Sequence, residues 1–146
     1  MNRTKTATRI LSVLAALFLL LASLTACSGG VTREEAKTAM DALLTALDNE
    51  NYAEAAALYH PDAAMTEDLL SAFAEQVKTK VGIDLTEGAV VEKITGMSAS
   101  YYDSNVDGSR YALTAKIKAG DKTADLTVEV IRNDKGYGIF RVECNP

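Results

Sequence analysis

Residues 32–48 carry apolar side chains at the spacing of one helix face. Thr32 is followed three positions later by Glu35, which is the pattern of a capping box at a helix start. The apolar positions that follow recur every three or four residues, at Ala36, Ala39, Met40, Leu43, Leu44 and Leu47. This pattern predicts an amphipathic helix over residues 33–48.

A second, shorter helix is expected directly after the first. Asn51 and Glu54 repeat the capping pattern. The apolar side of this helix is formed by Tyr52, Ala55, Ala56, Leu58 and Tyr59. Pro61 prevents the helix from continuing, because its ring removes a backbone donor and clashes with the preceding turn. The two helices are therefore expected to form a hairpin.

A third helix is expected between Thr66, which has the character of an N-cap, and Gly82, which marks a helix end. Its apolar stripe is formed by Leu69, Leu70, Phe73, Val77 and Val81. Residues 63–65, just before this helix, are expected to be extended.

From Thr86 onward apolar and polar residues alternate, which is typical of strands. A long first strand is expected over residues 89–103, with a bulge at Gly96, and a last strand over residues 137–143. One face of the second strand is formed by Tyr111, Leu113, Ala115 and Ile117. The third strand alternates through Leu126, Val128 and Val130. Turns are expected at residues 105–108, 120–121 and 133–136.

Helices first and an antiparallel four-stranded meander second is the element order of an α+β fold. Clean alternation in the strands indicates a sheet buried on one face, and the apolar faces of the helices must cover that face. The meander is expected to be curved. The chain length suits one domain with one core, and we place it at residues 32–146.

The first nine residues contain Arg3, Lys5 and Arg9 and no acidic residue, and residues 10–24 are almost entirely apolar. This is the order of a signal peptide. The apolar run of about 15 residues is shorter than the roughly 20 that a helix needs to cross the hydrocarbon core. The sequence therefore predicts a cleaved leader rather than a transmembrane anchor.

The end of the leader, Leu24-Thr25-Ala26-Cys27, resembles the lipobox of bacterial lipoproteins. The resemblance implies a signal peptide over residues 1–26 and acylation of the Cys27 thiol, with residues 27–31 as a short tether. Several acyl chains, such as palmitate, hold a protein stably on a membrane. The protein is then expected on the extracytoplasmic face of the cell membrane. The alternative is an ordinary signal peptide followed by a chance cysteine.

The stretch at residues 40–63, MDALLTALDNENYAEAAALYHPDA, resembles the cone-shaped domains of the nuclear transport factor two-like and cystatin-like superfamily, which includes polyketide cyclases. In these families a helix, a polar turn, a short helix and a segment like LYxPDA recur in this order. The resemblance covers essentially the whole mature chain. It implies a cone with a pocket between helices and sheet, used variously by isomerases, dehydratases, binding modules and interaction domains.

Net charge narrows the range of partners. Loss of Arg3, Lys5 and Arg9 with the leader changes the formal charge from −5 to −8. Such a surface repels phosphate backbones, so no nucleic acid partner is expected. The sequence has one histidine and two cysteines and shows no zinc-spaced cluster, phosphate-binding glycine loop or nucleophilic serine motif. No cofactor is therefore expected.

Acid–base chemistry in a cone pocket would need a carboxylate or histidine base and a hydrogen-bond donor. The candidates are Tyr59, His60, Asp62, Tyr101, Tyr102, Asp103 and Tyr111. Candidates for lining the pocket are Tyr59, Phe73, Tyr101 and Tyr111. His60 is the natural base because it titrates near neutrality, but a surface side chain that closes a helix C-terminus is the favoured interpretation. Asp62 also suits a turn.

Residues 103–108 match the opening of a calcium loop, with Asp103, Asn105 and Asp107 as ligand candidates and Gly108 at the bend. The bidentate glutamate of such a loop would fall at Thr114, and strands flank the loop where helices are usual. The alternative, a polar hairpin turn, explains the same residues by backbone geometry. We therefore predict no metal site.

Lipidation of Cys27 leaves Cys144 alone. Its position suggests a face shared with Phe140 and Val142, since these residues alternate along the last predicted strand. A buried structural thiol is expected, and a reactive thiol is the alternative.

These observations predict a lipid-anchored, non-catalytic binding or assembly module whose partner is an unidentified protein or a small apolar ligand. An isomerase- or dehydratase-type enzyme with His60 or Asp103 as base is the alternative. A third possibility is a structural homodimer through the sheet.

Overall fold

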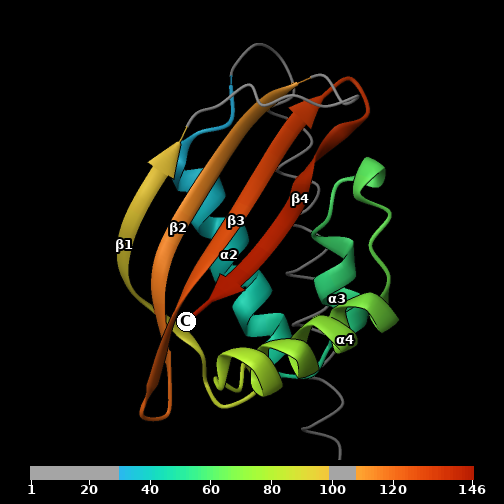
Figure 1. Ribbon diagram of the computed structural model, residues 1–146. Coiled ribbons are helices and arrows are strands. Elements are labelled where there is room, and N and C mark those ends of the chain that lie inside the picture. The colour runs from blue at the N-terminus through green and yellow to red at the C-terminus, as the bar shows by residue number, and fades with distance from the viewer. Residues whose placement is uncertain (1–29, 99–107) are drawn as a thin grey trace, which may run out of the picture.

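The computed structural model describes residues 30–98 and 108–146 and confirms the α+β fold (Figure 1). The helical part contains α2 (Arg33–Asp48), α3 (Tyr52–Ala57), the 3-10 turn η1 (Pro61–Ala63), α4 (Glu67–Gln76) and the π-helical turn η2 (Val77–Val81). The sheet contains β1 (Val90–Ser98), β2 (Ser109–Ala119), β3 (Lys122–Asn133) and β4 (Gly136–Asn145). The predicted signal peptide, Cys27 and residues 99–107 lie outside the described residues.

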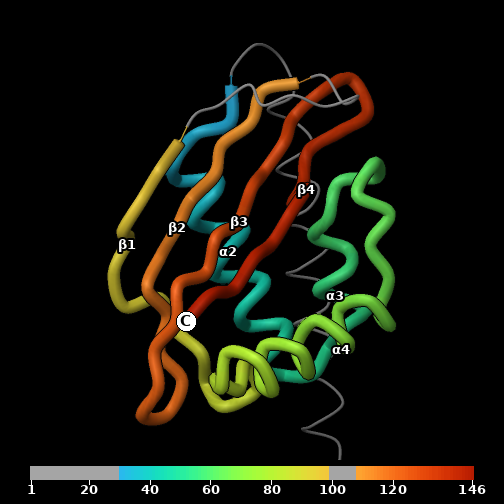
Figure 2. The backbone as a smooth tube through the Cα atoms, in the orientation of Figure 1, coloured from blue at the N-terminus to red at the C-terminus, as the bar shows by residue number. Residues whose placement is uncertain are grey.

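The sheet is an open antiparallel meander in the order β1-β2-β3-β4. Helix α2 crosses one face of this sheet, and α3 and α4 lie beside the edge of the sheet that β4 forms (Figures 1 and 2). The opposite face carries no helix among the described residues (Figure 1). The expected arrangement, with helices covering the apolar face of a half-buried sheet, is therefore confirmed.

The start of α2 is fixed by the predicted capping box. The Thr32 side chain accepts a hydrogen bond from the Glu35 backbone N–H at 3.2 Å, and the Thr32 backbone N–H donates to the Glu35 carboxylate at 2.9 Å. One side of α2 is buried by Ala36, Met40, Leu43, Leu44, Ala46 and Leu47. The predicted bounds of this helix are confirmed, because its capping and its apolar spacing agree.

The third predicted helix is confirmed, but two expectations around it are wrong. Residues 63–65 are not extended: η1 ends there and Ala64 has a left-handed backbone with φ 49°. Leu69 does not belong to the buried stripe and is 54% exposed. The buried positions are Leu70, Ala74 and Val77.

The core lies between α2 and the inner face of the sheet. Leu113, Ala115 and Ile117 of β2 stand opposite Val128, Leu126 and Ala124 of β3, all of them buried. Tyr111 shares this face, as predicted, and is half-buried. Other fully buried side chains are Met40, Leu43, Leu47, Leu70, Ile83, Leu85 and Ile139.

A bulge in the last strand pair changes the predicted face of one residue. The pairing slips between Glu129 and Val130, so Ile139 faces the core in place of Phe140. The Phe140 ring instead lies under the guanidinium of Arg110, 4.8 Å from it, on the outer face. The prediction that Phe140 shares the inner face is therefore wrong, because one extra residue reverses the alternation.

Cys144 stands opposite Leu126 on the inner face, but it is half-buried rather than fully buried. Partial burial, followed by the charge of Asp125, raises the pKa of its thiol to about 11. The thiol is therefore protonated at neutral pH, which is the state of a structural cysteine.

The two edges of the sheet differ. The β4 edge is paired at Ile139 with the segment after α3: the His60 N–H donates to the Ile139 carbonyl at 2.8 Å, and the Ile139 N–H donates to the Leu58 carbonyl at 2.9 Å. Gly138 permits this close approach. At the other edge, β1 has no neighbouring strand on its outer side within the described part of the chain.

Candidate functional site

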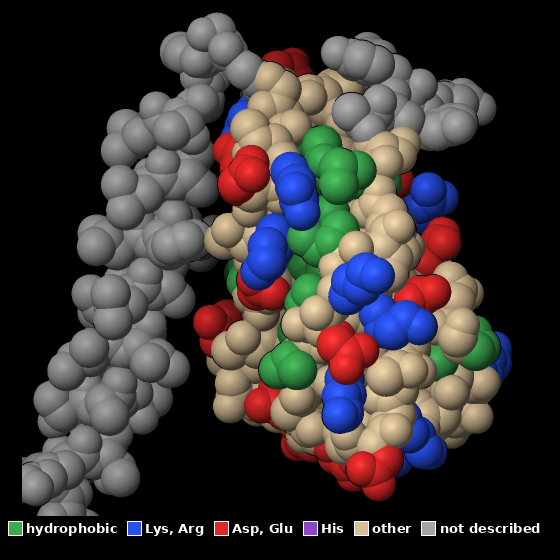
Figure 3. All heavy atoms as spheres, turned by 90° about the vertical axis from the view of Figure 1, so that its left-hand side faces the viewer, with side chains coloured by type: hydrophobic (Ala, Val, Ile, Leu, Met, Phe, Trp, Pro, Cys, Tyr) green, Lys and Arg blue, Asp and Glu red, His purple; other side chains and the backbone are tan. Residues whose placement is uncertain are grey.

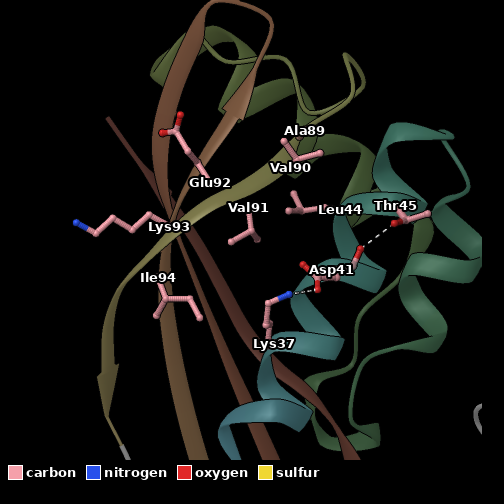
Figure 4. Close-up of a pocket in the computed structure, with 10 residues that line it drawn as sticks. All are labelled: Lys37, Asp41, Leu44, Thr45, Ala89, Val90, Val91, Glu92, Lys93 and Ile94. Carbon is pink, nitrogen blue, oxygen red and sulfur yellow. Dashed lines mark hydrogen bonds and ion pairs between the residues drawn. The ribbon is translucent and has the colours of Figure 1, made fainter.

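An open groove of about 510 Å³ runs between α2 and the free edge of the sheet (Figure 4). It is lined by Lys37, Asp41, Leu44 and Thr45 of α2, and by Ala89, Val90, Val91, Glu92, Lys93 and Ile94 along β1. The groove exists because α2 crosses the middle of the sheet and leaves the inner side of β1 partly uncovered (Figure 1).

The floor of the groove is apolar and its two rims are charged. Leu44 is buried, whereas Val91 and Ile94 are half-buried. On the helical rim the Lys37 ammonium contacts the Asp41 carboxylate at 2.6 Å, one turn away. Glu92 and Lys93 point away from α2 on the other rim (Figure 4). The groove therefore offers apolar contact between two mixed-charge borders.

Exposed apolar side chains extend this surface along β1. Val90 is 59% exposed and Met97 is 55% exposed. Figure 3 faces this edge and shows apolar side chains in a stripe bordered by charged ones. We call Val90, Val91, Ile94 and Met97 the β1 stripe. Large apolar side chains gathered on a surface are a feature of interaction sites.

Sequence reasoning did not find this groove. The β1 sequence alternates well enough to predict a strand, but its burial depends on how far α2 reaches across the sheet. The one available signal was the sequence order of a meander, which places the first strand at an edge.

His60 is buried, with 1% of its surface exposed, so the expectation of a surface side chain is wrong. Its Nδ1 accepts the Asp62 backbone N–H at 3.1 Å and thereby caps η1. Nδ1 must then carry no proton, and Nε2 donates to the Asn133 side-chain oxygen at 2.9 Å. Nδ1 thus caps η1, and Nε2 joins η1 to the end of β3 at Asn133.

Asp62, the neighbouring candidate, has the predicted role of a turn residue. A hydrogen bond from the Lys135 ammonium, at 3.0 Å, lowers the pKa of its carboxyl group. Its second carboxylate oxygen lies 3.8 Å from His60 Nδ1. The ion pair between Asp62 and Lys135 therefore fixes the turn between β3 and β4 against η1.

Among the aromatic candidates that the structure describes, Tyr59 is the most buried, with 8% of its surface exposed. Its hydroxyl has no hydrogen-bond partner among the described residues, and burial raises its pKa. Phe73 and Tyr111 are half-buried. None of the three lines the groove, and the remaining candidates lie outside the described residues: Tyr101, Tyr102, Asp103, Asn105 and Asp107.

A second, polar recess of about 530 Å³ lies beside the turn between β2 and β3, and Asp84 is its best-anchored residue. The Asp84 carboxylate contacts the Lys78 ammonium at 2.7 Å and accepts from the Thr86 backbone N–H at 3.0 Å. These contacts, that of Lys78 foremost, lower the pKa of Asp84 to about 2. Because the groups that donate to the Asp84 carboxylate belong to the protein itself, we assign Asp84 a structural role.

The lowered pKa of Asp84 predicts a pH-dependent contribution to stability. The folded state holds the ionised carboxylate, so the contribution is complete above the unfolded pKa of about 4 and is lost as the pH falls through about 2. Asp84→Asn should therefore reduce the free energy of unfolding at pH 7, and the difference from wild type should shrink between about pH 4 and pH 2. Urea unfolding at several pH values measures this.

Glu87→Gln is the matched control, because Glu87 lines the same recess and is exposed. It should change stability by less than about 0.5 kcal/mol at neutral pH. A difference between wild type and Asp84→Asn that stays constant from pH 7 to pH 2 would contradict the assignment.

Residues 30–98 and 108–146 contain no group of histidine, cysteine and carboxylate side chains placed to hold a metal ion. Within the same residues no helix is both long and apolar enough to cross a membrane. Comparison of the chain with protein-family models, with curated proteins and with solved structures finds no match. The resemblances to lipoproteins and to cone-shaped domains therefore stay predictions.

Proposed function

We propose that this protein is a lipid-anchored, non-catalytic binding or assembly module on the extracytoplasmic face of the cell membrane. The anchor is Cys27, and the binding site is the groove between α2 and β1. The cone-shaped superfamily remains the proposed family of the fold. Enzymes and binding modules both occur in it, so the site must decide between them.

The contrast between the two edges of the sheet carries the proposal. At the β4 edge, backbone hydrogen bonds pair Ile139 with the segment after α3. At the opposite edge the β1 stripe stays partly exposed beside the groove. Since burying apolar surface is the main favourable term in association, a partner gains most by covering this edge.

The contacts of His60, one of the two bases that the enzymatic alternative names, favour a structural role for this side chain. A general base must reach the proton that it removes. The His60 ring is almost fully buried, and both of its nitrogens are hydrogen-bonded within the protein. Protonation at Nδ1 would remove the hydrogen bond from the Asp62 N–H, so use of His60 as a base would disturb η1.

The start of the folded domain fits a short anchor. Val31 is buried, and its N–H donates to the Ser109 hydroxyl at 2.9 Å. Cys27 precedes Gly30 by three residues, which span at most about 10 Å when extended. A lipid on Cys27 would therefore keep the domain at the membrane surface, where a partner in the same membrane meets it at high effective concentration.

Site-specific photo-crosslinking in living cells tests the proposal. A benzoyl-phenylalanine at Ile94, inside the groove, should give a discrete membrane-associated adduct after illumination. The same probe at Leu69, which is exposed on α4 away from the groove, should give none. Adducts of equal yield from both positions, or no adduct from Ile94, would contradict the assignment of the groove as the binding site.

The same cells test the anchor. Cys27→Ser should leave the protein out of the membrane fraction and should abolish incorporation of labelled palmitate. A Cys27→Ser variant that still fractionates with the membrane, or that still incorporates labelled palmitate, would show that Cys27 is not the acylated residue.

A further inference from the structure

We infer that the occupant of the groove is a second copy of this chain, packed by two-fold symmetry so that the two β1 edges face each other. The inference deepens the proposed function, because it names the partner of the same groove. It rests on the shape of the β1 edge and on the order of charges along both rims.

The shape of β1 favours side-chain packing over addition of a strand. Its pairing with β2 slips twice, between Val91 and Lys93 and between Ile94 and Gly96. Bulges and an edge lysine are the features by which proteins prevent edge-to-edge hydrogen bonding. An extended peptide is therefore a poor occupant, whereas a folded surface can pack on the apolar side chains.

The charges on the two rims follow the same order. Helix α2 runs away from the tether and β1 runs back toward it (Figure 1). On α2, Lys37 lies nearer the tether end than Asp41, and on β1, Lys93 lies nearer to it than Glu92. Both rims are therefore positive toward the tether and negative toward the far end.

This order of charges is self-complementary under a two-fold axis perpendicular to the groove. Such an axis reverses the second copy, so Lys93 of one copy meets Glu92 of the other, and Lys37 meets Asp41 in the same way. An isologous interface requires this self-complementarity, because one patch must serve as both surfaces. A peptide of either net charge would gain nothing from it.

The charge of the whole protein also directs self-association to this groove. The mature chain has a formal charge of −8, so two copies repel each other over most of their surfaces. The four charged groove residues sum to zero, and between the rims lies the β1 stripe. The groove thus combines the lowest repulsion with apolar surface to bury.

A reversed copy also sets the orientation at the membrane. The 16 residues of α2 span about 24 Å, so the two tethers leave the dimer at opposite ends. Both lipids reach one bilayer only when the grooves lie along the membrane plane and the two-fold axis is normal to it.

Charge reversal on the full lipidated chain, in a density-matched detergent, tests the inference by sedimentation equilibrium. Wild type should be a dimer. Glu92→Lys and Lys93→Glu should each weaken it by about tenfold, because two attractive contacts become repulsive. The double variant Glu92→Lys/Lys93→Glu should restore the dimer. Both side chains are exposed, so folding is preserved.

Mixing the two single variants gives the sharpest outcome. A chain with Glu92→Lys and a chain with Lys93→Glu, carrying different tags, should form a heterodimer more tightly than either forms a homodimer. A monomeric wild type overturns the inference. A dimer whose dissociation constant is unchanged by both charge reversals and by mixing the two variants also overturns it. An adduct of Ile94 with a different protein, together with a monomeric chain, overturns it while leaving the proposed binding function intact.

Discussion

Replacement of Gly138 by alanine should reduce the free energy of unfolding by about 3 kcal/mol, a typical cost of forcing an extra carbon into a packed interior. A Cβ at this position would lie 2.5 Å from the His60 nitrogen and 2.7 Å from the Tyr59 carbonyl carbon. Both are backbone atoms and cannot rotate away. The segment after α3 must therefore move off β4, which strains the hydrogen bonds to Ile139.

Gly96→Ala is the matched control for this prediction. Gly96 also lies in a strand, and neither glycine has a positive φ. Its added Cβ would lie 3.5 Å from the Thr114 side chain, which is ordinary contact. The control should change stability by less than about 0.5 kcal/mol in urea unfolding. Equal losses from both variants would mean that strand glycines, rather than closure of the β4 edge, explain the effect.

The elements that sequence reasoning predicted well are those specified by neighbours in the chain. The capping box at Thr32 and the apolar spacing after it are local, and α2 has the predicted bounds. The alternation in β2 is equally local, and Leu113, Ala115 and Ile117 do share the core face.

Predictions failed where long-range contacts decide. Nothing near Phe140 in the sequence signals a bulge, since the bulge adjusts β4 to β3 and lets the Phe140 ring reach Arg110. The burial of His60 likewise depends on Asn133, which is 73 positions away. The groove depends on where α2 crosses the sheet, and no local pattern contains that information. The proposed binding surface was therefore the part of the molecule least accessible to sequence reasoning.

The second large effect is expected at Glu129, which is buried on the outer face of the sheet. Its carboxylate contacts the Arg110 guanidinium at 2.8 Å, with only 8% and 5% of the two side chains exposed. Glu129→Gln keeps the shape but removes the negative charge beside a buried positive one. Breaking a buried ion pair from one side costs about 3 kcal/mol or more, because the negative charge in direct contact with the buried Arg110 guanidinium is removed. Urea unfolding of the two proteins measures the loss.

Glu143→Gln is the matched control, because it removes the same charge from an exposed ion pair instead of a buried one. Glu143 contacts Arg141 at 3.6 Å, but both side chains are more than half exposed. Its loss should cost less than about 1 kcal/mol, as is usual for surface pairs. Replacing both partners, with Arg110→Met and Glu129→Leu, should recover most of the stability, because neither member of the buried pair is then charged. If the double variant is as unstable as Glu129→Gln, the cost lies in lost packing around Phe140 rather than in the charge.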